Sequence, residues 1–114
     1  MVESPLIGDS YALVSRIYAV TADFPEAERP MLGQQLRETA LAVASQATDA
    51  VTTDDPAERQ EALRLAAVGC ITVDIQIRLA ADLNCLSEAD EKELAGLVKK
   101  LNDGVARERR TVRR

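Results

Sequence analysis

The sequence predicts an all-α fold, an antiparallel up-down four-helix bundle that forms a single domain over residues 1–114. Apolar residues recur at three- and four-residue steps in four segments, which is the spacing of one face of a helix. Capping and helix-stopping residues separate these segments, and the links between them are short. A chain of 114 residues has room for one modest core, so association with other copies would help it bury apolar surface.

The first two helices, expected near residues 9–24 and 28–52, are joined by a sharp corner. Pro25 ends the first helix, because the residue before a proline is pushed out of the helical region. Pro30 fits the first turn of the second helix. The apolar face of the first helix comprises Leu13, Val14, Ile17, Tyr18, Val20 and Phe24. The apolar face of the second comprises Leu32, Leu36, Ala40, Val43, Ala47 and Val51.

The third helix is expected near residues 56–83, with Asp55 as its N-cap and Pro56 at its first position. From Ile71 to Arg78 the sequence alternates apolar and polar residues, a pattern that also favours a β-strand. A strand needs a partner, and no second segment alternates comparably. We therefore predict a helix whose apolar residues spread around it because it also meets another subunit.

The fourth helix is expected near residues 87–107, with Ser87 as its N-cap. Acidic residues crowd its first turns, where they complement the positive end of the helix dipole. Carboxylates could instead hold two iron ions, but ferritin-like sites also need Glu-x-x-His pairs. The chain contains no histidine, so capping is the preferred interpretation and we expect no metal, cofactor or catalytic residue.

Cys70 and Cys85 are the only cysteines. They could form a disulfide or share a metal, but two thiolates without histidine make a poor zinc site. Small buried hydrophobic side chains in a reducing compartment are the favoured interpretation. No signal peptide and no apolar run of membrane-spanning length is evident, so we expect a cytoplasmic protein without membrane contact.

Charge is unevenly distributed, with a net charge of −10 over residues 1–98 and +5 over residues 99–114. A basic tail from about residue 107 is either a nucleic-acid contact or a solvated, partly disordered terminus. The candidate phosphate-binding residues are Lys99, Lys100, Arg107, Arg109, Arg110, Arg113 and Arg114. The acidic body repels nucleic acid and no aromatic residue lies in the tail, so we favour weak or no binding.

The corner between the first two helices carries a distinctive set of residues: Tyr18, Thr21, Phe24, Pro25, Glu28, Arg29, Leu32, Gln35, Arg37 and Ala40. In these positions the chain resembles the four-helix-bundle family encoded in intervening sequences of bacterial large-subunit ribosomal RNA genes. Its relatives include accessory variability proteins of diversity-generating retroelements. The resemblance implies a four-helix bundle and a pentamer, and it suggests a nucleic-acid-associated role beside a reverse transcriptase.

Two kinds of candidate site follow. The polar corner residues Glu28, Arg29, Gln35 and Arg37, beside Phe24 and Pro25, are either a partner-binding patch or a network that fixes the turn. The expected oligomer interface lies on the third helix and includes Gly69, Cys70, Ile75 and Ile77.

We consider three functions from different classes, and the sequence does not support them equally. The first is a non-enzymatic scaffold or adaptor that forms a ring of identical subunits. Such a ring could also bind a further protein. The second is an accessory nucleic-acid-binding protein that acts through the basic tail. The third, an enzyme with a carboxylate-based site, is disfavoured because histidine, the commonest general base, is absent.

Overall fold

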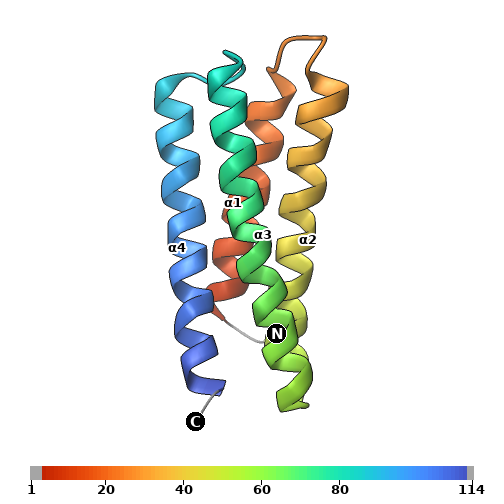
Figure 1. Ribbon diagram of the computed structural model, residues 1–114, viewed down its shortest axis with the longest axis vertical. Helices are drawn as coiled ribbons and strands as arrows, with labels where there is room; N and C mark the ends of the chain where they lie inside the picture. Colours follow the sequence, from red (N-terminus) through yellow and green to blue (C-terminus); the bar gives the residue numbers. More distant parts are fainter. Residues whose placement is uncertain (1–3, 113–114) are drawn as a thin grey trace.

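A computed structural model describes residues 4–112. Four long helices run alternately up and down (Figure 1). They are α1 (Pro5–Ala22), α2 (Gln34–Thr52), α3 (Pro56–Asp82) and α4 (Glu88–Val112), with a π-helical turn η1 (Arg29–Gly33) before α2. The described residues contain no strand, so the all-α prediction is confirmed and the alternating segment of α3 is helical.

The order of the helices around the bundle decides which faces remain open. Both α1 and α3 pack against α2 and α4. They therefore occupy diagonal corners, and Figure 1 shows α3 in front of α1. The outward faces of α1 and α3 lie on opposite sides of the subunit.

Local capping explains where the helices begin. The Asp55 carboxylate accepts a hydrogen bond from the Ala57 N–H at 3.0 Å, and the Ser87 hydroxyl accepts one from the Asp90 N–H at 3.1 Å. Both were predicted as caps. Ser4 does the same for Leu6 at 3.2 Å, so α1 begins at Pro5, earlier than the expected residue 9.

The corner differs from a simple start of the second helix. The Gly33 N–H donates to the Glu28 carbonyl at 3.0 Å, a five-residue step that defines the wider π-helical turn. At the other end of the chain, α4 continues to Val112. The part of the predicted basic tail that the structure describes is therefore helical, whereas Arg113 and Arg114 lie outside the described residues.

The core is built from small and medium aliphatic side chains around one aromatic ring, that of Phe24. Close helix approach depends on glycine at one point. A Cβ on Gly69 of α3 would collide with Val43 Cγ2 of α2. Gly69 thus serves the contact between α2 and α3 inside the subunit.

The alternation in α3 has a simple geometric consequence. Two residues along a helix rotate by about 200°, so alternate apolar residues fall on nearly opposite faces. Val73 and Ile77 point into the core, while Ile71 and Ile75 point outward. A pattern typical of a strand has therefore produced a helix with two apolar faces.

Candidate interaction surface

An apolar stripe runs along the outward face of α3. Ile71 and Ile75, at its centre, each keep 60% of their surface exposed. Together with Leu83, the C-cap residue that follows α3, the exposed apolar residues of this face form a set that we call the α3 stripe: Leu65, Val68, Ile71, Ile75, Leu79 and Leu83. Its members follow one another at three- and four-residue steps, so they form one continuous surface rather than isolated exposed side chains.

Among the four residues predicted for an oligomer interface, only Ile75 belongs to the α3 stripe. Cys70 and Ile77 are buried in the core of the subunit, with Ile77 only 1% exposed. Gly69 faces Val43 of α2. The placement of these three residues at an exposed interface is corrected, because the sequence shows that α3 has two apolar faces without showing which one the bundle covers.

Arg37 connects α2 to the end of α1. Its Nε donates to the buried Thr21 hydroxyl at 2.7 Å, and its Nη2 donates to the Tyr18 carbonyl at 3.3 Å. The guanidinium also lies 4.7 Å from the centroid of the Tyr18 ring, a cation–π distance. The Thr21 hydroxyl in turn donates to the Ile17 carbonyl at 2.7 Å. These contacts favour the structural interpretation of Arg37.

The other predicted corner residues have different surroundings. Phe24 is buried, and its carbonyl accepts a hydrogen bond from Arg29 Nε at 3.4 Å. The Pro25 carbonyl accepts hydrogen bonds from the Glu28 and Arg29 N–H groups. Gln35 is exposed, and within residues 4–112 its side chain makes no hydrogen bond. The corner therefore brings most of the set together but leaves Gln35 on the surface.

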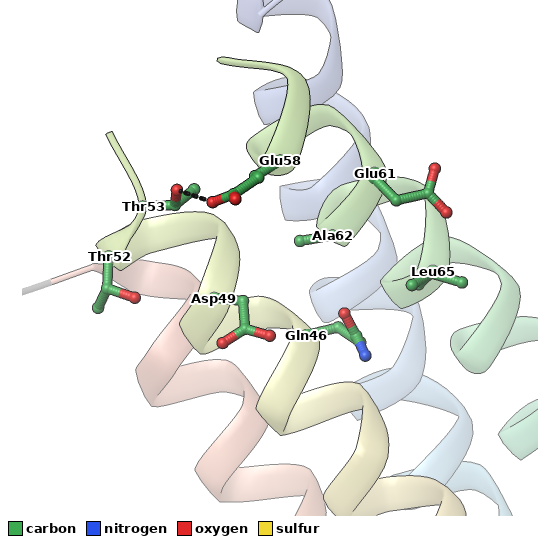
Figure 2. A pocket seen from close by; sticks show the side chains of 8 residues that line it. All are labelled: Gln46, Asp49, Thr52, Thr53, Glu58, Glu61, Ala62 and Leu65. Carbon is green, nitrogen blue, oxygen red and sulfur yellow. Dashed lines mark hydrogen bonds between the residues drawn. The ribbon is translucent and has the colours of Figure 1, made fainter. Parts of the chain in front are cut away.

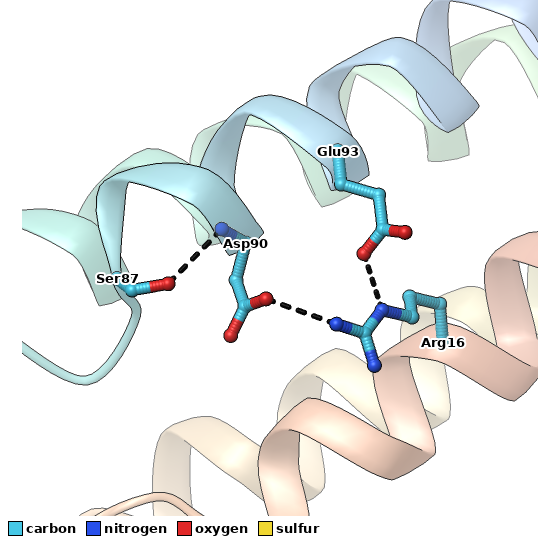
Figure 3. Close-up of polar contacts among 4 residues, drawn as sticks. All are labelled: Arg16, Ser87, Asp90 and Glu93. Atoms are coloured by element: carbon cyan, nitrogen blue, oxygen red, sulfur yellow. Dashed lines mark hydrogen bonds and ion pairs between the residues drawn. The ribbon is translucent and has the colours of Figure 1, made fainter.

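Arg16 joins α1 to the start of α4, a link that the sequence analysis missed (Figure 3). Its guanidinium pairs with Asp90 at 2.9 Å and also with Glu93. These two acids raise the pKa of Arg16, chiefly through the hydrogen bond to Glu93. The sequence could not predict this pair. Arginines on one helix and runs of carboxylates on another occur together in many helical proteins without pairing.

A groove of about 410 Å³ opens where α2 ends and α3 begins (Figure 2). Most of the residues that line it are of polar type: Gln46, Asp49, Thr52, Thr53, Glu58, Glu61, Ala62 and Leu65. Glu58 accepts a hydrogen bond from the Thr53 hydroxyl at 2.7 Å, and Glu61 pairs with Arg64 at 2.7 Å. The pair with Arg64 lowers the pKa of Glu61. The hydrogen bond to Glu58 thus supports the connection between α2 and α3, whereas the pair of Glu61 with Arg64 lies within α3.

The predicted phosphate-binding residues do not form one basic patch. Lys99 pairs with Asp103 at 2.8 Å, which lowers the pKa of Asp103, and Lys100 lies 3.5 Å from Asp9 of α1. Three of the remaining cations lie near the end of α4: Arg107, Arg109 and Arg110. Within the described residues these three arginines form no ion pair, although Arg107 contributes to the lowered pKa of Asp103 and Arg109 is half-buried.

The two cysteines are free thiols in different surroundings. Cys70 is buried in the core, and burial raises the pKa of its thiol to about 11. Cys85 is half-buried beyond the end of α3; its pKa is raised by burial and then by Glu28. Among residues 4–112 no group of three or more acidic or cysteine side chains is arranged to hold a metal ion.

These surroundings predict unequal reactivity toward an aromatic disulfide reagent. At mildly alkaline pH we expect Cys85 to react and Cys70 to react at least about a hundredfold more slowly, because its core position limits access and its raised pKa depletes the thiolate. Both rates should rise with pH. In the Cys85→Ser variant the fast phase should disappear, and full reaction should require denaturant. A fast phase that survives this substitution would contradict the buried position of Cys70.

None of the described helices is both long and apolar enough to cross a membrane. Comparison with known proteins identifies the family of the chain. A search of curated proteins found no match. The family model of the 23S rRNA-intervening sequence protein matches residues 5–106, from the start of α1 to within α4. Since this match covers most of the chain and all four helices, the chain belongs to the 23S rRNA-intervening sequence protein family.

Proposed function

We propose that the chain is a non-enzymatic scaffold or adaptor that works as a homo-oligomer. The family resemblance implies a ring of five subunits. The observation that carries the proposal is the α3 stripe, which leaves six large apolar side chains exposed along one helix. Apolar area removed from water contributes about 25 cal/mol per Å². A continuous stripe of this kind on a small subunit is typical of an interaction surface.

Other features support the same function. Four carboxylates have structural partners: Glu58 accepts a hydrogen bond from Thr53, Glu61 pairs with Arg64, and Asp90 and Glu93 pair with Arg16. Two free cysteines suit a reducing compartment, so we propose that the protein is cytoplasmic.

The test is the mass of the particle in solution, measured by light scattering or sedimentation. We expect the wild-type chain to exceed its monomer mass of 12.4 kDa at micromolar concentration. Ile75→Asp should shift the equilibrium to the monomer, because a charge on the α3 stripe cannot be buried without a partner. Gln60→Asp, which adds the same charge at an exposed position of α3, is the matched control and should keep the wild-type mass. A wild-type monomer would refute the scaffold function.

A second candidate, an accessory nucleic-acid-binding protein, is favoured by the arginines near the end of α4, which form no ion pair with another residue of the range 4–112. We propose that any binding is weak, sequence-independent and carried by Arg107, Arg109 and Arg110. Replication of these cations around an oligomer would raise the apparent affinity. The acidic body opposes it, so binding should fade steeply as salt rises.

Fluorescence anisotropy with single-stranded RNA tests this candidate. Replacing Arg107, Arg109 and Arg110 with Gln should weaken low-salt binding about tenfold and flatten its salt dependence. The control neutralises three exposed cations elsewhere: Arg64, Arg78 and Lys92. Truncation after Leu101 is unsuitable because it removes the buried core residue Val105. Equal binding by wild type and the triple variant would exclude this site, and no binding by wild type at low salt would favour the protein-only scaffold.

A further inference from the structure

The outward face of α1 is almost free of charge. Only two of its residues are charged, Asp9 and Arg16, and both turn toward α4, where they meet Lys100 and Asp90. By contrast, α4 carries twelve charged residues among 25. The exposed residues that remain on α1 after Pro5 are uncharged: Gly8, Tyr11, Ser15, Tyr18, Ala19 and Ala22. We call this set the α1 face.

The α1 face and the α3 stripe lie on opposite sides of the subunit, because α1 and α3 occupy diagonal corners (Figure 1). Tyr11 is the most exposed large apolar side chain of the described residues, at 72%. Tyrosine combines a large apolar ring with a hydroxyl that can stay hydrated at an interface edge, and it is enriched in interfaces between proteins.

We propose that the α3 stripe of one copy packs against the α1 face of the next copy. This inference rests on the proposed homo-oligomer and adds which two surfaces meet. Neither surface contains a charged residue, and a buried unpaired charge would oppose association. Arg37 of α2, which lies over the Tyr18 ring, already donates hydrogen bonds to the Thr21 hydroxyl and the Tyr18 carbonyl. The contact also leaves the highly charged α4 in solvent. Because the two surfaces differ, the contact is heterologous and repeats from copy to copy, closing into a ring where the rotation allows.

A symmetric contact between two α3 stripes is the main alternative. It would cover the α3 stripe in a dimer but leave Tyr11 and the rest of the α1 face exposed. The two arrangements differ in whether a charge introduced on α1 dissociates the assembly. In the heterologous contact, Tyr11→Asp breaks the assembly as effectively as Ile75→Asp. In the symmetric contact, a change at position 11 has no effect.

The experiment combines Tyr11→Asp and Ile75→Asp, with Gln60→Asp as the control for added charge and circular dichroism as the check on folding. We expect each of the first two variants alone to be a monomer. Mixed, they should form a one-to-one dimer and nothing larger, because Tyr11→Asp keeps an intact α3 stripe and Ile75→Asp keeps an intact α1 face. Native mass spectrometry of the mixture, raised stepwise to millimolar concentration, would resolve the dimer.

Each other outcome overturns the inference. If Tyr11→Asp kept the wild-type mass, the α1 face would not be the partner surface, although the scaffold function would stand. If both variants were monomeric but gave no mixed dimer, the two surfaces would not meet. If the wild-type chain were itself monomeric, the proposed function would fail together with this inference. Should Tyr11→Asp unfold, Tyr11→Ser and Ser15→Asp take its place at the same surface.

Discussion

Ile77→Asp is expected to unfold the subunit. Ile77 is 1% exposed and packs in the core between the helices. The substitution removes a buried aliphatic side chain and places a carboxylate in the apolar core. The expected loss exceeds about 4 kcal/mol, a large share of the 5–15 kcal/mol that stabilises a typical domain. Circular dichroism and urea titration would show lost helicity or a much lower midpoint.

Ile75→Asp is the matched comparison, since it makes the same chemical change only two residues away. Ile75 is 60% exposed on the α3 stripe. The variant should keep its helix content and change mainly the mass of the particle. If both variants unfolded alike, or if Ile77→Asp stayed folded, the orientation of α3 in the bundle would be wrong.

Arg37→Ala is expected to lower the free energy of unfolding by about 2 kcal/mol. The substitution removes charged hydrogen bonds to the Thr21 hydroxyl and the Tyr18 carbonyl, and with them the cation–π contact. In a domain of this size the melting temperature should fall by about 10 °C. Thermal unfolding followed by circular dichroism provides the measurement.

Two further variants separate structure from partner binding at the corner. Gln35→Ala, at an exposed neighbouring position, should leave the melting temperature within about one or two degrees of wild type, since exposed substitutions seldom exceed 0.5 kcal/mol. Arg37→Lys should recover only part of the loss, because an ammonium cannot reproduce the planar fork of a guanidinium. If Arg37→Ala left stability unchanged while association with a partner protein vanished, the corner would be a binding patch instead.

Local sequence was sufficient to predict the four helices and most of their ends. Periodicity defines an apolar face, and capping residues such as Asp55 and Ser87 act within one turn, so both can be recognised without knowing the fold. The start of α1 at Pro5 was missed although Ser4 carries the same capping signal. The continuation of α4 to Val112 was missed because charged residues near a chain end leave no apolar pattern that marks where a helix stops.

The tertiary structure alone decided which surface each side chain joins. The alternation from Ile71 to Arg78 showed that α3 is apolar on more than one face, yet Ile75 and Ile77 are chemically identical. Only the positions of α2 and α4 place Ile77 in the core and leave Ile75 outside. The same holds for Gly69 against Val43 and for Arg16 with Asp90, since these pairs are distant in sequence and packing brings them together. Periodicity is a property of one helix, whereas burial depends on its neighbours.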